Sequence, residues 1–417
     1  MGQGLTDEEL LERVQRETFR YFWEGAHPVS GLAFDRCPRD GGSSVDNDRP
    51  VAIGGSGFGT LAIIVACERG WLTRAQTLRR LDLMLECLER APRYHGMYPH
   101  FIRGDSGATI PFSPQDDGAD LVESSFLFQG LLCARAYFGG TGQEEARLRE
   151  RISRLWHEAE WSWYVQPGRK ALTWHWSPTH GFVLNHEIQG WNECLITYLL
   201  AAASPRHAVT AESYHAGWAS GHNFLNRHSF ENIELPLGPP WGGPLFFAHF
   251  SFCGIDPRGL RDRYADYWEQ NVHHTRINYR YCVRNPHGYK GYGPECWGLS
   301  AGDGATGYSA HAPDNDQGVI TPAAALASFA YAPQAAMAAL RHFSADLGER
   351  IWGRFGFVDG FSEQHDWYSD SFVAINQGPI VAMIENYRSG LLWKLFMRIP
   401  EIRAALGKLS FESPDPD

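Results

Sequence analysis

The chain has 417 residues, of which 43% are hydrophobic and 20% are charged, with 48 acidic and 37 basic side chains. This composition excludes a disordered protein, because the apolar fraction is large enough to form a sizeable core. The net charge of -11 argues against a nucleic-acid partner, since nucleic-acid-binding surfaces are usually basic.

The first predicted helix covers residues 6–25, where Thr6 and Glu9 form a capping box and apolar residues follow at helical spacing. The same spacing recurs along the chain and predicts about a dozen helices in all. Long loops rich in Gly, Pro and aromatic residues separate them, and such loops often carry binding sites. The other helices are expected at about 57–69, 73–91, 118–138, 143–164, 191–204, 210–219, 258–282, 321–330, 333–347 and 377–397, and the long loops at 92–115, 167–190, 220–247 and 283–320.

No linker or shift in composition divides the chain, so we expect a single domain over residues 1–417. Helices paired by short turns and interrupted by long loops favour an all-α toroid over a four-helix bundle. A solenoid is disfavoured because no fixed-period repeat is visible.

The amino terminus, MGQGLTDEELLERV, lacks the basic and apolar regions of a secretion signal, and no apolar run is long enough to span a bilayer. We therefore expect a soluble chain, which would be periplasmic if a signal was removed from a longer precursor. The eight cysteines occur singly, without metal-finger spacing, and are expected to be free thiols.

The glycine-rich segment VAIGGSGFGT resembles two catalytic or binding motifs without matching either. The third glycine of a dinucleotide-binding fingerprint is missing, and Phe58 replaces the glycine that a nucleophile elbow requires. We expect these glycines to serve close helix packing or a tight helix entry.

The strongest local signal is the acidic run in SPQDDGADLVESSF. Asp116, Asp120 and Glu123 have i, i+4, i+7 spacing, which predicts that they share one face at the start of a helix, while Asp117 points aside. Three carboxylates on one stripe repel one another unless they bind a cation, share protons or hold a polar ligand. An ordinary acidic first turn is the alternative, and this run alone supports both interpretations equally.

The same run also reads as DDxxD, formed by Asp116, Asp117 and Asp120. In a helical protein this pattern can hold magnesium and a prenyl diphosphate. Such an enzyme also needs a second metal-binding helix and several cationic groups for the phosphate oxygens, and we find no second motif. A magnesium-dependent diphosphate enzyme is therefore the less favoured alternative.

A second signal is GWNECLITYLL, where Asn192 can cap a helix and Glu193 lies in its predicted first turn. A capping role is the simpler interpretation of Glu193 in isolation. Its pairing with the acidic run is more informative, because glycoside hydrolysis needs one protonated acid and one ionised carboxylate on either side of the sugar. The histidine spacings match no zinc motif, so we predict no metal site and no cofactor.

Several segments resemble the bacterial glycoamylase-like family that includes endo-β-1,2-glucanases. They include FSPQDDGADLVESSFLFQGLL, WHWSPTHGF, GWNECLITYLLAAASP and YKGYGPECWGLSAGDG, and the resemblance extends from about residue 5 to 411. It implies an (α/α)6 barrel with long loops that form a cleft at one end. It also implies inverting cleavage of β-1,2-glucosidic bonds in an oligo- or polysaccharide, without a metal. The catalytic groups of the family fall on Asp116, Asp120, Glu123 and Glu193.

We expect Glu193 to be the general acid and one of the other three carboxylates to activate water. Trp and Tyr combine an apolar face with a polar edge, which suits sugar rings, and many of them fall in the loops. The expected substrate-binding residues are Trp174, His175, Trp176, Trp191, Asn192, Tyr292, Trp297, Asn376 and Gln377.

One position departs from the family. Asp is common where this chain has Asn376, and an amide cannot act as a base. If that Asp is catalytic in relatives, either Asp366 or Asp370 takes over here, or the chain is a glucan-binding protein that has lost the chemistry.

Overall fold

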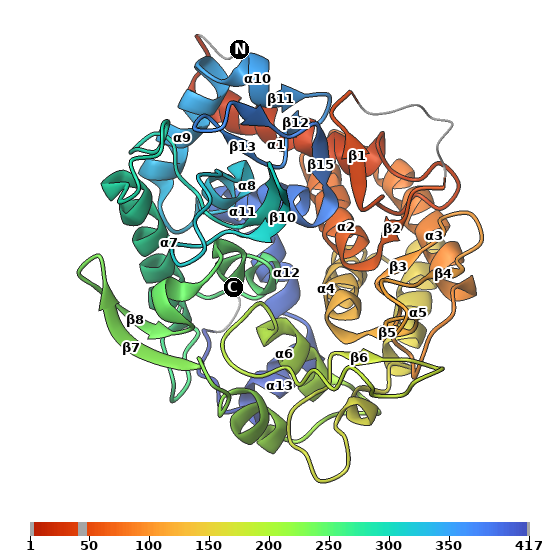
Figure 1. Cartoon of the computed structure of the whole chain (residues 1–417). Helices are drawn as coiled ribbons and strands as arrows, with labels where there is room; N and C mark the ends of the chain where they lie inside the picture. Colours follow the sequence, from red (N-terminus) through yellow and green to blue (C-terminus); the bar gives the residue numbers. More distant parts are fainter. Residues whose placement is uncertain (1–3, 41–47, 415–417) are drawn as a thin grey trace.

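A computed structural model of the chain describes residues 4–40 and 48–414, which are mostly helical, with only short strands between the helices (Figure 1). The helical class is therefore confirmed. The α-helices are α1 (Asp7–Trp23), α2 (Ile53–Glu68), α3 (Arg74–Arg90), α4 (Leu121–Tyr137), α5 (Gln143–His157), α6 (Leu195–Ala203), α7 (Tyr267–Arg284), α8 (Pro322–Leu326), α9 (Pro333–Ala345), α10 (Gly348–Ile351), α11 (Ala374–Arg388), α12 (Leu391–Met397) and α13 (Pro400–Lys408).

The strands form small antiparallel sheets in the loops and were not predicted. One sheet has three strands, in the order β2-β3-β4, and the others are pairs. The strands are β1 (Arg36–Pro38), β2 (Val51–Ala52), β3 (Phe101–Ile102), β4 (Thr109–Ile110), β5 (Ala119–Asp120), β6 (His175–Trp176), β7 (Leu225–Phe230), β8 (Ile233–Leu237), β9 (Ala301–Gly304), β10 (Gly307–Ala310), β11 (Trp352–Gly353), β12 (Gly356–Phe357), β13 (Phe361–Ser362), β14 (Trp367–Tyr368) and β15 (Ser371–Val373).

The helix start predicted from a capping box agrees with the structure. Several helix boundaries predicted from apolar spacing alone differ from it. The predicted capping box of Thr6 and Glu9 starts α1. The predicted helix at 377–397 is instead two helices, because Gly390 has a left-handed backbone (φ 69°) between α11 and α12. The predicted helix at 210–219 is a π-helical turn at Ser213–Trp218, and the one at 258–282 starts only at Tyr267.

Helices α2 and α4 pack backbone to backbone. A Cβ atom added to Gly57 would lie 2.1 Å from the carbonyl oxygen of Phe126, and one added to Gly130 would lie 2.2 Å from the carbonyl oxygen of Gly57. No larger side chain fits at either position without separating the helices. The role in close helix packing that the sequence suggested for the VAIGGSGFGT glycines is confirmed at Gly57.

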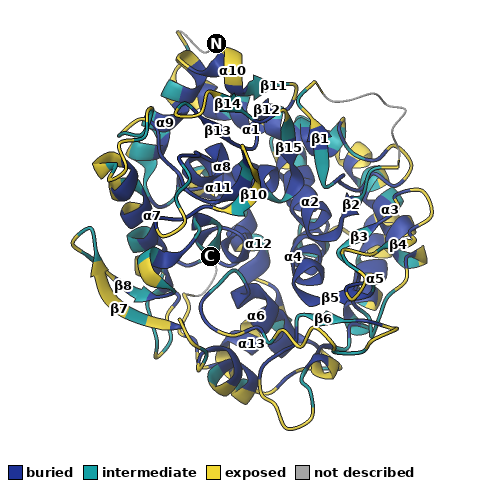
Figure 2. Cartoon of the chain, in the orientation of Figure 1, coloured by how far each residue is buried: buried dark blue, intermediate teal, exposed yellow. Residues whose placement is uncertain are grey.

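The helices that surround the centre of the molecule begin at the same end. Helix α2 packs against α4 and α11, α4 also packs against α6, and α1, α3 and α5 lie outside them (Figure 1). The central helices are buried along almost their whole length (Figure 2). One cavity lies at the starts of α2, α4, α6 and α11. It is lined there by Ala52, Glu123, Glu193 and Val373, in the same order.

The structure also bears on the expected absence of a membrane-spanning helix and on the state of the cysteines. None of the helices within 4–40 and 48–414 has both the length and the apolar character that crossing a membrane requires. The eight cysteines all lie in these ranges and are free thiols, as predicted.

Candidate active site

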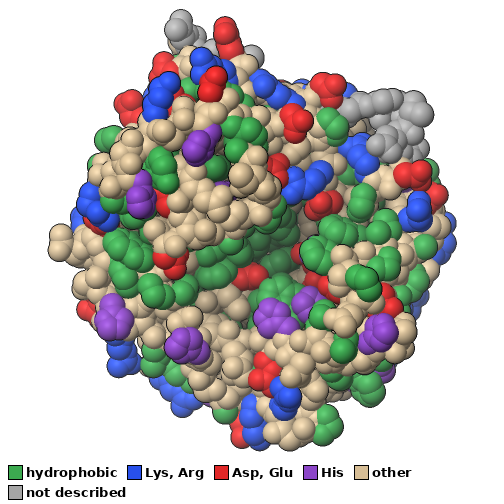
Figure 3. Space-filling view, in the orientation of Figure 1, with side chains coloured by type: hydrophobic (Ala, Val, Ile, Leu, Met, Phe, Trp, Pro, Cys, Tyr) green, Lys and Arg blue, Asp and Glu red, His purple; other side chains and the backbone are tan. Residues whose placement is uncertain are grey.

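The cavity has a volume of about 420 Å³ and opens to solvent as the hollow at the centre of Figure 3. Hydrophobic side chains cover most of its wall, and acidic side chains lie at its floor. An apolar, aromatic wall with a few polar groups is typical of a small-molecule site. The aromatic lining residues are Phe101, Phe112, Phe126, Trp174, Phe246, Phe250 and Tyr308, and the carboxyl groups belong to Asp35, Glu123 and Glu193.

Glu123 lies in the first turn of α4 and points into the cavity beside the start of α2. Its Oε2 accepts a hydrogen bond of 2.7 Å from the backbone N–H of Gly54. A Cβ atom on residue 54 would lie 2.6 Å from this oxygen, so the contact requires glycine. Burial, reinforced by the charge of Asp120, raises the pKa of Glu123 to about 7.

Asp120 is held by its neighbours rather than exposed to the cavity, with 1% of its surface accessible. As the N-cap of α4, its Oδ1 accepts hydrogen bonds from the N–H groups of Val122 and Glu123, and a third from Trp174 Nε1 at 2.9 Å. Its Oδ2 lies 2.9 Å from His100 Nδ1. Burial opposes ionisation of Asp120, but these partners hold its pKa below the usual value.

His100 links Asp120 to the cavity, which it also lines. Burial disfavours its charged form, yet the carboxylates of Glu123 and Asp120 raise its pKa to about 9. The imidazole is therefore cationic at neutral pH and offsets part of the negative charge of the cluster. Sequence analysis did not identify His100, because a single histidine in a loop carries no spacing signal.

Asp116 precedes α4 in a turn, and only Glu123 lies on the helix itself. The predicted helical face shared by Asp116, Asp120 and Glu123 is therefore wrong, because the helix starts at Leu121 and not at 118. The turn still brings Asp116 near the cluster: His175 Nε2 lies 3.6 Å from Asp116 Oδ2 and 4.0 Å from Asp120 Oδ2. Burial raises the pKa of Asp116.

The DDxxD interpretation fails on the same geometry. A diphosphate enzyme presents these aspartates from one helix to shared metal ions, whereas here all three precede α4. Asp117 Oδ2 accepts a hydrogen bond from Thr179 Oγ1 at 2.8 Å, away from the cluster, and Asp120 is occupied by its helix cap and His100.

Glu193 reaches the cavity from the turn that precedes α6. The predicted helix at 191–204 is shorter than expected and begins at Leu195, because Asn192 Oδ1 accepts the N–H of Cys194 and forms a turn first. The hydroxyl of Ser251 donates a hydrogen bond to the backbone carbonyl of Glu193. Burial, with the nearby charges of Asp120 and Glu123, raises the pKa of Glu193 to about 7.

These two raised values predict a pH dependence of stability. The usual glutamate pKa is 4.5, so between pH 4.5 and about 7 the folded chain binds more protons at Glu123 and Glu193 than the unfolded chain does. Their ionisation therefore destabilises the fold progressively as the pH rises through this range, and the penalty is constant above it.

Glu193→Gln removes the part of this destabilisation that comes from ionisation of Glu193, because the amide does not ionise. We expect the free energy of unfolding of the variant, relative to the unaltered chain, to increase between pH 4.5 and 7 and then to level off. Urea denaturation at several pH values measures this difference. A difference that does not change with pH would contradict the raised pKa of Glu193.

The cavity is also lined by residues that sequence analysis missed. Arg36 Nη1 lies 2.5 Å from Asp303 Oδ1, and its guanidinium stands 5.4 Å from the ring centre of Tyr308. Asp35 precedes this arginine in the chain, and burial raises its pKa. Phe112 and Tyr308 line the cavity with 59% and 50% of their surface exposed, so both offer ring faces to a ligand.

Asn376 lies behind the cavity wall and does not line it. Its amide Nδ2 donates hydrogen bonds to the Ala301 carbonyl at 2.9 Å and to Asp359 Oδ1 at 2.8 Å. The suggested replacements, Asp366 and Asp370, are exposed at the surface and do not line the cavity either. Asn376 therefore positions a buried carboxyl group here.

The predicted substrate-binding residues fall into two groups: some lie in or near the cavity or are half-buried, and the others are buried in the core. Trp174 lines the cavity, His175 lies beside the acidic cluster, and Asn192 and Trp176 are half-buried nearby. Tyr292 is half-buried, and its hydroxyl donates to Asp316 Oδ1 at 2.8 Å. The remaining four are buried in the core and do not line the cavity: Trp191, Trp297, Asn376 and Gln377.

A helical scaffold that holds two carboxyl groups of raised pKa in an aromatic cavity is typical of the helical glycoside hydrolases. Comparisons with known proteins agree. Residues 185–400 match the Glycoamylase family model, which describes a glucoamylase, and the chain belongs to this family.

Two of the similar proteins come from bacteria. The chain is 44% identical to the exo β-1,2-glucooligosaccharide sophorohydrolase (non-reducing end) of Parabacteroides distasonis; the match covers 97% of this chain but only 58% of that relative's length. An endo-β-1,2-glucanase structure from Chitinophaga pinensis, a complex with sophorotriose and glucose, is 48% identical. It superposes with a TM-score of 0.95 over 99% of this chain and 100% of that chain.

A more distant likeness concerns the fold alone. The endo-β-1,2-glucanase from Talaromyces funiculosus is 13% identical, with a TM-score of 0.66 over 98% of this chain and 92% of its own.

Proposed function

We propose that this protein is a glycoside hydrolase that cleaves β-1,2-glucosidic bonds in β-1,2-glucan or its sophoro-oligosaccharides. The observation that carries the proposal is the pair Glu123 and Glu193, which line one cavity and each have a pKa of about 7. Near neutral pH such a pair can hold one proton and one charge, as acid/base catalysis requires. The names of the two bacterial relatives supply the substrate.

In the proposed mechanism Glu193 is the general acid and Glu123 is the base. Glu123, held by the Gly54 N–H, takes a proton from a water molecule whose oxygen attacks the anomeric carbon. The bond from this carbon to the glycosidic oxygen breaks, and that oxygen takes the proton of Glu193. A single displacement of this kind inverts the anomeric configuration and needs carboxyl groups roughly 6.5–9.5 Å apart.

The other two acidic residues have supporting roles in this proposal. Asp120 accepts hydrogen bonds at both oxygens, so it positions His100, Trp174 and the start of α4. Asp116 pairs with His175 at the edge of the cluster. Neither oxygen of Asp120 is placed to activate water, which favours Glu123 as the base among the three predicted candidates.

We also propose that the helices form an (α/α)6 barrel in one catalytic domain over residues 1–417. Support comes from the packing of α2 against both α4 and α11, with α1 and α3 outside, because alternation of inner and outer helices is the pattern of such a barrel. The shared starts of the inner helices support a cleft at one end.

The test is incubation of the protein with linear β-1,2-glucan, and separately with other β-glucans and α-glucans, followed by chromatography of the products. We expect sophoro-oligosaccharides from β-1,2-glucan alone, released first as the α-anomer by NMR. Binding of the glucan without products would contradict the hydrolase. That outcome would favour the glucan-binding alternative, in which the cleft binds the glucan without cleaving it.

A further inference from the structure

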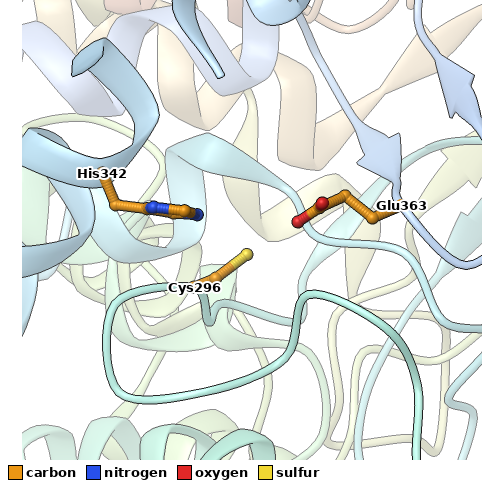
Figure 4. Close-up of side chains that lie close together, drawn as sticks. All are labelled: Cys296, His342 and Glu363. Atoms are coloured by element: carbon orange, nitrogen blue, oxygen red, sulfur yellow. The ribbon is translucent and has the colours of Figure 1, made fainter. Parts of the chain in front are cut away.

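Cys296, His342 and Glu363 converge on one point, although they come from three separate segments (Figure 4). Cys296 lies in the loop after α7, His342 in α9, and Glu363 directly after β13. Each contributes one atom capable of binding a metal, and these atoms all lie within 4.8 Å of one another. None of the three lines the 420 Å³ cavity, so the cluster is distinct from the candidate active site.

The chemistry of the three groups is that of a zinc site. Thiolate, imidazole and carboxylate are the side chains that bind Zn²⁺ in proteins, with metal–ligand distances of about 2.0–2.3 Å. Small rotations of the side chains would bring the three atoms to these distances from one ion. A dication would also balance the negative charges of a thiolate and a carboxylate held this close together.

His342 is oriented as a metal-binding histidine. Its Nδ1 lies 2.8 Å from Oδ2 of Asp346, one turn further along the helix, which leaves Nε2 for the cluster. Metal-binding histidines almost always hydrogen bond a carboxylate or carbonyl through the second ring nitrogen, because this fixes the ring and its tautomer.

The backbone presents the other two groups. Gly293 and Cys296 exchange backbone hydrogen bonds of 3.0 and 3.1 Å, a tight turn that fixes the position of Cys296. Gly291 has a left-handed φ of 92°, and a Cβ atom there would lie 2.4 Å from Glu363 Oε1. Glycine at this position therefore lets the carboxylate approach the loop.

A separate cavity of about 320 Å³ opens beside Cys296 and His342, and exposed Glu295 also lines it. It leaves room for a water molecule, or for the Glu295 carboxylate, as a fourth ligand. We propose that Cys296, His342 and Glu363 bind a zinc ion whose fourth position faces this cavity. The ion would tie two loops to α9 and stabilise the fold outside the catalytic cleft.

The experiment measures zinc binding by the full chain after metal removal, using equilibrium dialysis and metal analysis. We expect about one tightly bound ion per chain, and at least 100-fold weaker binding in Cys296→Ser and in His342→Gln, which each remove a ligand. Asp346→Asn keeps all three ligands and should weaken binding by about 10–100-fold. The control is Cys67→Ser, a partly exposed cysteine outside the cluster, which should bind zinc normally.

Two further measurements distinguish this site from adventitious binding. Cobalt should give a thiolate-to-metal absorption band with the unaltered chain and not with Cys296→Ser. Zinc should raise the melting temperature of the unaltered chain but not that of His342→Gln, whose side chain is partly exposed and whose replacement should not prevent folding. Failure of the unaltered chain to bind zinc, or equal binding by both ligand variants, would overturn the proposal.

Discussion

Glu193→Gln is expected to lower kcat/KM for β-1,2-glucan by about 10²–10⁴-fold, the usual contribution of a general acid. The amide has nearly the same shape as the carboxyl group but has no proton to give to the leaving oxygen. The backbone of residue 193 is held through its carbonyl by Ser251, so the turn before α6 should be unchanged. Initial rates of oligosaccharide release, measured by chromatography, give the effect.

The matched control is Glu212→Gln, the same chemical change at an exposed position that pairs with Lys170 at 2.9 Å. It should retain the activity of the unaltered chain. Circular dichroism should show both variants folded. Full activity of Glu193→Gln would exclude Glu193 as the acid, whatever the substrate of the enzyme.

Gly54→Ala is expected to reduce kcat by about 10²-fold, the effect of misplacing a catalytic group by about 1 Å. The new Cβ atom would lie 2.6 Å from Oε2 of Glu123 and 2.9 Å from its Cδ, so the carboxyl group must leave the Gly54 N–H. Both groups are buried, and we expect a loss of about 1–3 kcal/mol in the free energy of unfolding from overpacking. Kinetic assays and urea denaturation measure the two effects.

Gly407→Ala is the control for a helical glycine that becomes alanine. Gly407 lies in α13, and a Cβ atom there would meet no atom within 4 Å. This variant should keep its activity and gain about 0.5–1 kcal/mol of stability, because alanine favours the helix. If Gly54→Ala retains full activity, the contact between α2 and Glu123 is not needed for catalysis.

Some of this architecture is encoded locally and could therefore be predicted. The capping box of Thr6 and Glu9 depends on residues three positions apart, and it starts α1 as predicted. A second box, formed by Thr73 and Gln76, starts α3 but was not identified from the sequence. The acidic run is local in the same way, so the sequence identified Asp120 and Glu123 as neighbours. Its spacing did not reveal that Asp120 caps the helix, which starts at Leu121, or that Asp120 pairs with the distant strand β6.

Residues that act through long-range contacts could not be predicted. His100 and Asp35 occur singly in loops, and nothing near them in the sequence marks them as cavity residues. The tryptophans illustrate the same limit: Trp174 lines the cavity while Trp297 is buried and donates to the Ala335 carbonyl. Spacing motifs likewise miss the Cys296 cluster, because its members are far apart in the chain.

The backbone contact between α2 and α4 limits how this protein can be engineered. Gly57 and Gly130 leave no space for a larger side chain, so the two helices form one rigid unit that carries Gly54 and Glu123 at the end facing the cavity. Mutant libraries that vary Gly57, Gly130 and their neighbours in the contact between α2 and α4 should yield mostly misfolded chains. Variation of the exposed rim at Phe112 and Tyr308 offers a route to new substrate lengths, because these side chains can change without moving the helices.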